Sequence, residues 1–210
     1  MASLSKPIYA FVDASNLFYG GVKSLGWKID YQKLLKYLKD KYRVRKCFYY
    51  GGVELFDFEY SILNNRSIDL NALKKYLSKK LKDPKVPEYQ IVLIERSIKR
   101  VNFYLNLDKF GYDLRLKPVK IFKEENGRQT RKANCDVDMT FDMMRYMAQY
   151  SGLVALTGDG DFAPVLCYLK NHGRNIKILA RGERSAREIK QLAGGDFRDF
   201  VRLRKELEYK

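Results

Sequence analysis

The stretch Leu153-Val154-Ala155-Leu156-Thr157-Gly158-Asp159-Gly160-Asp161-Phe162 decides the fold of this chain. It begins as a short apolar run, typical of a buried strand, and ends in a glycine turn with two carboxylates. The apolar run from Ile8 to Val12 ends in a similar way, at Asp13. In an open parallel sheet, the carboxyl ends of neighbouring strands lie at one edge, where ligand sites form. The sequence therefore predicts that Asp13, Asp159 and Asp161 converge.

A third acidic group, Asp136, Asp138 and Asp142, lies just upstream in an otherwise strongly apolar segment. Asp138 and Asp142 are four residues apart and so share one face of a helix predicted from about 136 to 150. A charged group in apolar surroundings needs a partner. Asp136 could cap the helix, and Asp142 could be a supporting carboxylate paired with Lys132 or Arg145. We therefore favour Asp136 and Asp138 over Asp142 as metal ligands.

The acidic groups are concentrated in a chain that is otherwise basic. Its 210 residues contain 41 Lys and Arg against 25 Asp and Glu, which gives a net charge of +16. Residues 136 to 161 hold five Asp and only Arg145 as a basic residue, a local charge of −4. Repulsion would raise the pKa of some of these carboxyls unless a divalent cation or nearby Lys and Arg compensated them. The basic remainder favours a polyanionic partner, although a merely soluble basic surface is the alternative.

Other polar side chains near the predicted site have more than one possible role. Asn16 and Thr157 could bind a carboxylate or a substrate phosphate, or could equally stabilise their turns. Asp161 could bind the metal, orient a metal-bound water or cap the following helix. The sole histidine, His172, is expected at a helix end in a structural role, which leaves no Ser-His-Asp triad.

Strand and helix patterns alternate along the chain. Strands are predicted at 8–12, 44–50, 114–122, 153–156 and 176–180, and helices near 34–42, 98–110, 136–150 and 162–173. This order predicts an α/β fold, a parallel sheet flanked by helices on both faces. Residues from about 54 to 90 interrupt the alternation with a lysine-rich helical insertion capped by Asp69, whose lysines are either solvated or in contact with RNA. We predict one domain over 1–185, followed by a helical tail over 186–210 that packs on it.

Three isolated cysteines, Cys47, Cys135 and Cys167, indicate neither a disulfide framework nor a zinc site, and they suit a reducing compartment. No stretch approaches the roughly 20 apolar residues that a membrane helix needs. We expect a soluble, cytoplasmic protein without a membrane partner.

Three segments, Val12 to Asn16, Lys132 to Asp142 and Thr157 to Pro164, together resemble the NYN domain family, including its LabA-like members, which belong to the PIN-like nucleases. The resemblance covers residues 8 to 180 and rests on the combination of motifs. It implies a PIN-like sheet and a phosphodiesterase that depends on Mg²⁺ or Mn²⁺ and acts on RNA, with single-stranded DNA as a further candidate. Its implied metal ligands are Asp13, Asp136 or Asp138, Asp159 and Asp161, and Asn16 matches the asparagine of the first motif.

Two other functions are compatible with the sequence. Some members of the family are degenerate, so a catalytically weak RNA-binding module is one alternative, but the presence of all the acidic positions favours activity. A small-molecule phosphatase is suggested by Asp136 to Thr140 and Gly158 to Gly160, which resemble motifs of haloacid-dehalogenase-like enzymes. Their order and spacing do not fit that family, so the phosphatase is disfavoured. A homo-oligomer or a protein partner is compatible with either reading.

Overall fold

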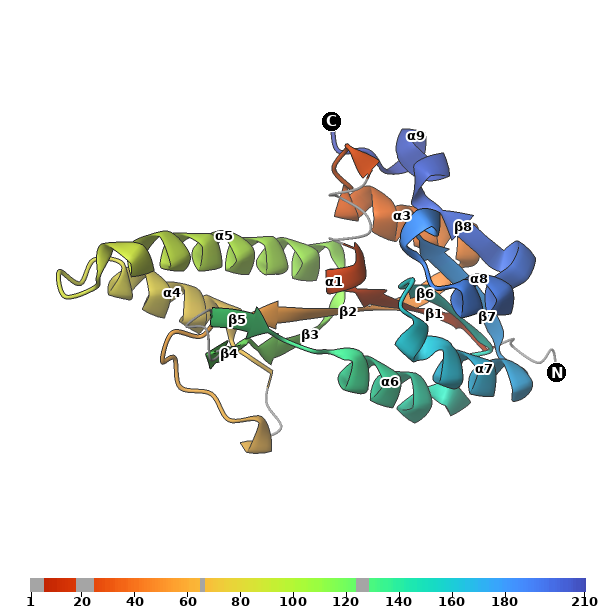
Figure 1. Ribbon diagram of the computed structural model, residues 1–210, viewed down its shortest axis with the longest axis horizontal. Coiled ribbons are helices and arrows are strands. Elements are labelled where there is room, and N and C mark those ends of the chain that lie inside the picture. The colour runs from red at the N-terminus through yellow and green to blue at the C-terminus, as the bar shows by residue number, and fades with distance from the viewer. Residues whose placement is uncertain (1–5, 18–24, 65–66, 124–128) are drawn as a thin grey trace. The chain divides into compact units, whose positions relative to one another are not determined.

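The computed structural model describes residues 6–17, 25–64, 67–123 and 129–210 (Figure 1). The chain divides into two units, each with its own internal packing. Unit 1 comprises Met1–Tyr50 and Cys135–Lys210, and unit 2 comprises Gly51–Asn134. The unit that contains the lysine-rich helix is therefore wider than the insertion predicted at 54–90.

Unit 1 is built on parallel strands. They are β1 (Ile8–Asp13), β2 (Val44–Val53), β6 (Gly152–Leu156), β7 (Asn175–Ala180) and β8 (Phe197–Asp199), in the order β2-β1-β6-β7-β8. The last residues of β2 belong to unit 2, and β3 (Asp113–Pro118) follows β2 in the sheet order. Val12 lies opposite Leu156 in the register, so β1 and β6 end side by side. This register brings the polar residues that follow both strands to one edge of the sheet.

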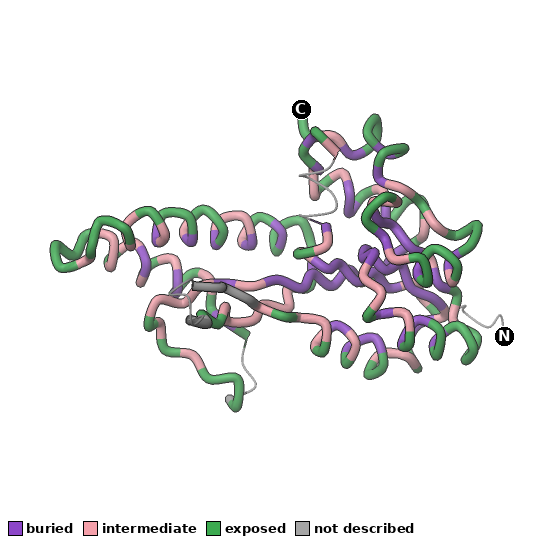
Figure 2. Tube along the Cα trace, viewed as in Figure 1, coloured by how far each residue is buried: buried purple, intermediate pink, exposed green. Residues whose placement is uncertain are grey.

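Helices cover both faces of the sheet in unit 1 (Figure 1). Tyr9 and Phe11 of β1 belong to the core that also contains residues of α6 (Asp136–Arg145), α7 (Ala163–Asn171) and α8 (Arg187–Ala193). On the other face lies α3 (Tyr31–Tyr42), whose Tyr31 ring packs edge-on against Tyr49 of β2. The strands are buried along most of their length (Figure 2). The predicted α/β class, with a parallel sheet between helices, is confirmed.

The structure differs from the expected elements in several places. The polar residues between the predicted strand at 114–122 and the predicted helix at 136–150 contain β5 (Gln129–Lys132), which pairs antiparallel with β4 (Lys120–Lys123). The polar composition of this segment does not reveal the pairing. Helix α6 ends at Arg145, and a short 3₁₀ helix (Met147–Gln149) leads on to β6. The tail predicted as helical holds α8 and α9 (Arg204–Leu207), but it also supplies the edge strand β8.

Unit 2 contains two helices, α4 (Leu70–Lys80) and α5 (Glu88–Phe110), whose contact is the most extensive between helices in the described chain. Asp69 caps α4 by accepting hydrogen bonds from two backbone N–H groups, as predicted. Gly111 ends α5 in the left-handed conformation, with φ of +99°. Helix α5 begins directly after Pro87, ten residues earlier than expected, and Pro87 precedes it in an extended conformation with φ of −61° and ψ of 146°. No helix in the described ranges is long and apolar enough to span a membrane.

Candidate metal centre

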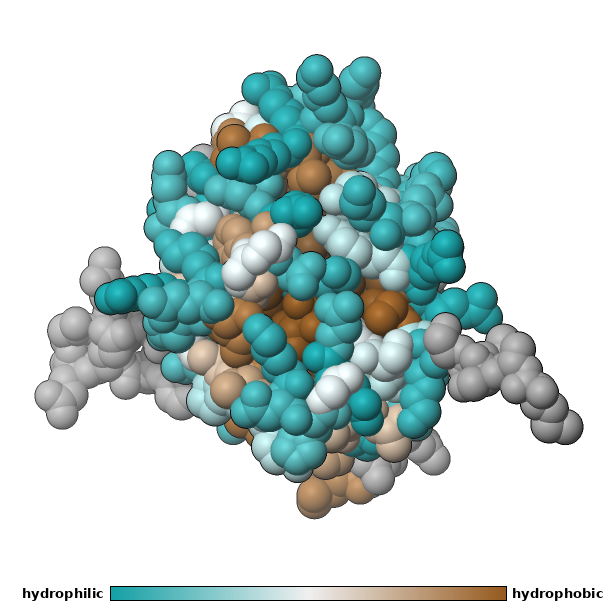
Figure 3. Space-filling model, turned by 90° about the vertical axis from the view of Figure 1, so that its right-hand side faces the viewer, coloured by the Kyte–Doolittle hydropathy of each residue, from teal (hydrophilic) through white to brown (hydrophobic). Residues whose placement is uncertain are grey.

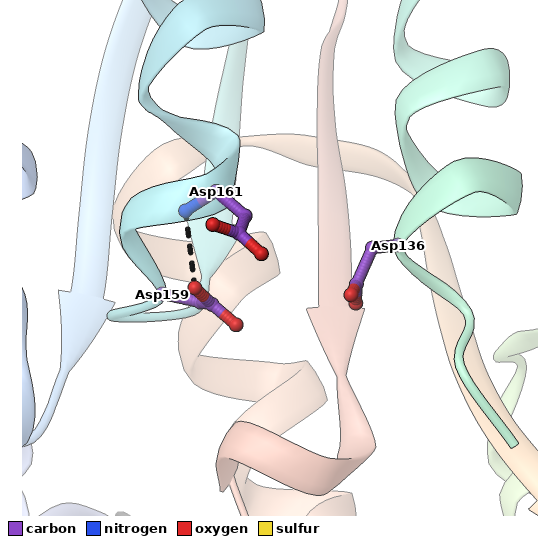
Figure 4. Close-up of side chains that lie close together, drawn as sticks. All are labelled: Asp136, Asp159 and Asp161. Atoms are coloured by element: carbon purple, nitrogen blue, oxygen red, sulfur yellow. Dashed lines mark hydrogen bonds between the residues drawn. The ribbon is translucent and has the colours of Figure 1, made fainter. Parts of the chain in front are cut away.

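Three carboxylates come together at the carboxyl edge of the sheet in unit 1. Asp136 begins α6, and Asp159 and Asp161 follow β6; one carboxylate oxygen from each lies within 4.8 Å of the others. In Figure 4 the side chain of Asp136 points toward Asp159 and Asp161. Asp136 and Asp159 are half-buried, and Asp161 is exposed to solvent. The group of three carboxylates is therefore partly buried and is open to solvent at Asp161.

The turn that carries Asp159 is held by its own side chain. Asp159 Oδ1 accepts a hydrogen bond from the Asp161 N–H at 3.0 Å and caps the 3₁₀ helix Gly160–Phe162 that leads into α7. Gly158 is required here, because a Cβ at this position would lie 2.4 Å from Ser185 Oγ. The Gly158 carbonyl in turn accepts a hydrogen bond from the Ala186 N–H at 2.8 Å. The turn thus packs directly against the loop before α8.

Asp13 is almost fully buried, and both of its carboxylate oxygens accept hydrogen bonds. Oδ1 caps the single-turn helix α1 (Ala14–Asn16), accepting from the backbone N–H groups of Ser15 and Asn16 and from the Ser15 hydroxyl at 2.7 Å. Oδ2 accepts from the Thr157 hydroxyl at 3.2 Å, and Thr157 Oγ1 accepts from the Asp159 N–H. Asp13 is thereby connected to Asp159 through Thr157. It lies outside the group of three carboxylates, and its role as a metal ligand stays a prediction.

Asn16 joins the first motif to the glycine turn. Its Oδ1 accepts a hydrogen bond from the Gly158 N–H at 3.0 Å, across 142 residues of sequence. Of the two readings from the sequence, this contact is the turn-stabilising one, and it places Asn16 beside the turn that carries Asp159. A contact between Asn16 and a substrate phosphate stays a prediction.

The other two aspartates of α6 have different surroundings. Asp142 is buried, accepts a hydrogen bond from the Tyr50 hydroxyl at 3.0 Å and forms an ion pair with Arg145 at 2.8 Å. Asp138 is half-buried in the first turn of α6, near the positive end of the helix dipole, and is not among the three grouped carboxylates. The side chain of Lys132 lies outside the described part of the chain. The roles predicted for Asp138, Asp142 and Lys132 toward metal or substrate stay predictions.

Two residues near the turn have no counterpart among the sequence-based candidates. Ser185 packs against Gly158. A Cβ on Gly160 would lie 2.5 Å from Glu188 Oε1, so the carboxylate of Glu188 lies next to the turn. Neither residue belongs to a local motif, because each reaches the turn only through the fold. Their only sequence signal is the pair of glycines itself, which indicates close approach by another part of the chain.

The three grouped residues offer only oxygen ligands, which are the donors that Mg²⁺ and Mn²⁺ prefer. Oxygens bound to one Mg²⁺ lie within roughly 4 Å of one another, given metal–oxygen distances of about 2.1 Å. The oxygens of the three carboxylates lie within 4.8 Å of one another, close to that range. The donor set therefore fits a hard divalent cation.

Comparisons with known proteins agree with this architecture. The chain is 25% identical over 210 residues to the Low amplitude and bright protein LabA of Synechococcus elongatus, covering 96% of this chain and 90% of LabA. A crystal structure of a protein of unknown function from Vibrio parahaemolyticus superposes with a TM-score of 0.62 at 17% identity, covering 95% of this chain and 96% of that one. This similarity shows a shared fold.

The T5 D15 protein, co-crystallised with metal ions, is more distant. Its TM-score is 0.42 at 15% identity, with 81% of this chain and 53% of that chain covered. A TM-score this low does not establish a common function.

A family model described as the NYN domain matches residues 55–200, which is more than half of the chain. The matched region contains Asp136, Asp159 and Asp161, whereas Asp13 and the rest of β1 precede it. The resemblance drawn from the sequence motifs is confirmed: the chain belongs to the NYN domain family.

Proposed function

We propose that this protein is a metal-dependent nuclease that hydrolyses RNA phosphodiester bonds, with Mg²⁺ or Mn²⁺ held by Asp136, Asp159 and Asp161. The observation that carries the proposal is the convergence of these three carboxylates from two separate elements at the carboxyl edge of the sheet. Membership of the NYN domain family and the net charge of +16 support it. RNA as the substrate follows from the resemblance of the motifs. We include Asp13 as a further proposed ligand and Asp138 as the alternative to Asp136.

A divalent cation bound there would supply Lewis-acid activation of a water and would offset charge at the scissile phosphate. The protein's part is to hold the carboxylates in place. Asp159 is fixed by its hydrogen bond from the Asp161 N–H, and Asp136 by its position at the start of α6. Asp13 and Thr157 support the turn through two hydrogen bonds. The Asp159 N–H donates to the Thr157 hydroxyl, which in turn donates to Asp13. A site held this way needs little rearrangement to bind a cation.

Exposed cations would hold the flanking phosphates without reading sequence. On α4 and just beyond it, Lys75, Lys79 and Lys82 recur at helical spacing and are exposed. Among the described residues, no carboxylate pairs with any of them. We propose that this lysine face of unit 2 contacts the RNA backbone, rather than serving only as a solvated surface.

The test is cleavage of labelled single-stranded and structured RNA, with DNA controls, in the presence of Mn²⁺, Mg²⁺ or EDTA. Asp159→Asn should keep the hydrogen bond to the Asp161 N–H but remove a charge from the site, and its cleavage rate should fall at least about a hundredfold. Glu206→Gln is the matched control: it removes one exposed carboxylate elsewhere in unit 1 and should cleave as the wild type does.

Each alternative gives a different result. Salt-sensitive RNA binding without metal-dependent cleavage would overturn the nuclease proposal in favour of a binding module. Hydrolysis of p-nitrophenyl phosphate with intact RNA would instead indicate a small-molecule phosphatase. Equal cleavage by wild type and Asp159→Asn would remove Asp159 from the proposed site.

A further inference from the structure

The amino edge of the sheet in unit 1 carries a cluster of basic side chains, whereas the carboxyl edge carries the three aspartates. Strand β1 has six residues, so five steps of about 3.3 Å place the amino edge of unit 1 roughly 17 Å from the carboxyl edge. Figure 3 looks onto this end of unit 1, where hydrophilic side chains cover most of the surface around apolar atoms at its centre. Strand β2 starts at this edge, with Val44 opposite Ile8.

An open depression of about 500 Å³ lies where α3 joins β2, lined by Lys39, Arg43, Val44 and Arg45. Val44 is buried beneath it, and the three basic side chains are exposed. In the part of the chain that the structure describes, none of these three cations forms an ion pair with a carboxylate. The neighbouring carboxylate of α3, Asp40, is already paired with Lys36. The depression therefore has three positive charges that the protein itself does not compensate.

Structural needs explain only part of this cluster. Cations in the last turn of a helix interact favourably with its dipole, which accounts for Lys39 at the end of α3. Arg43 ends α3 in the left-handed conformation, with φ of +56° and ψ of +37°, a position where glycine is conformationally favoured. Arg45 lies on the strand beyond the helix. The end of the helix requires neither arginine side chain. Arg43 and Arg45 instead add positive charge to the surface where α3 joins β2.

We propose that Lys39, Arg43 and Arg45 bind phosphate groups of a nucleic-acid backbone at this second site. Guanidinium groups match phosphate oxygens in a two-pronged arrangement, and a lysine adds a further charge-assisted hydrogen bond. The depression is open and lined by cations around a single valine, which suits a strand passing across it. An enclosed apolar pocket would be expected for a free nucleotide. The proposal rests on the proposed function only for the identity of the polyanion, and the site is separate from the three aspartates.

The test measures binding of single-stranded RNA in EDTA, so that cleavage does not contribute. The variant combines Lys39→Gln, Arg43→Gly and Arg45→Gln. Arg43→Gly gives the helix end its favoured residue, which offsets the loss of the Lys39 charge near the end of the helix. The melting temperature should therefore stay close to that of the wild type, so that lost binding cannot be attributed to unfolding. A matched control, Lys28→Gln with Arg202→Gln and Lys205→Gln, removes three exposed charges elsewhere in unit 1.

At about 0.1 M salt the site variant should bind RNA at least about tenfold more weakly than the control, and the slope of log K against log salt should be shallower by about 2, at about 0.7 per phosphate contact. Equal affinities and slopes for the site variant and the control would overturn the proposal. A parallel arm with inorganic pyrophosphate identifies the source of the phosphate: weaker pyrophosphate binding with unchanged RNA binding would overturn the nucleic-acid assignment. Absence of cleavage in the nuclease assay would leave these binding results standing, so the two proposals fail separately.

Discussion

Removing one carboxylate from the candidate metal centre should stabilise the protein when no metal is present. Asp136, Asp159 and Asp161 have oxygens within 4.8 Å of one another. At that separation two unit charges repel by about 0.9 kcal/mol in a water-like dielectric and by about 3.5 kcal/mol at an effective dielectric of 20. Asp161 is exposed, so the water-like value applies more closely. Asp159→Asn abolishes two of the three repulsive pairs, and we expect a gain of about 1 to 2 kcal/mol.

The substitution leaves the local structure of the turn intact. Asparagine keeps the Oδ1 that accepts the Asp161 N–H, and Asn and Asp are about equally good caps. For a chain of this size about 1 kcal/mol corresponds to roughly 2 to 4 °C in melting temperature. The melting temperature of Asp159→Asn in EDTA should therefore rise by about 2 to 8 °C.

The assay is thermal unfolding of wild type, Asp159→Asn and the control Glu206→Gln, each in EDTA and in Mn²⁺. Wild type and control should gain stability with Mn²⁺, by about 2.7 kcal/mol at 100 times the dissociation constant. Asp159→Asn should gain little, because its site has lost a ligand charge. A lower melting temperature for Asp159→Asn in EDTA, or an equal response of all three proteins to Mn²⁺, would refute the reasoning.

Three further predictions concern individual residues of unit 1. Asp142→Asn removes the carboxylate paired with Arg145 and should destabilise the protein by about 1 to 2 kcal/mol in urea unfolding while leaving the response to Mn²⁺ unchanged; loss of that response would place Asp142 in the metal site. Gly158→Ala forces a Cβ to within 2.4 Å of Ser185 Oγ and should destabilise by about 1 to 3 kcal/mol, whereas unchanged stability in the same assay would contradict this packing. Burial raises the pKa of the Tyr150 hydroxyl above its ordinary value of 10.0. The contribution of the neutral hydroxyl to the free energy of unfolding is therefore complete below about pH 10 and declines as the pH rises further. The stability advantage of wild type over Tyr150→Phe should accordingly be smaller at about pH 11 than at about pH 7, and an equal difference at both pH values in urea unfolding would contradict the shift.

Local sequence determined the elements that make up the sheet and the places where they end. The apolar runs became β1 and β6, and each is followed directly by the polar turn that the sequence predicts. Asp69 and Gly111 define the start of α4 and the end of α5, because caps act between residues a few positions apart. Such interactions can be predicted from sequence, since both partners lie in the same short window.

Tertiary structure alone decided which carboxylates meet. Asp136 lies beside Asp159 and Asp161 because α6 packs on the face of the sheet where β6 ends, whereas Asp13, adjacent in the sheet, turns its carboxylate to its own helix cap and to Thr157. The approach of Glu188 to Gly160 likewise depends on where α8 packs. These contacts are set by strand register and helix packing between distant segments, which local periodicity does not encode. The sequence by itself therefore determined the candidate carboxylates, and the packing of α6 against the sheet decided that Asp136 lies beside Asp159 and Asp161.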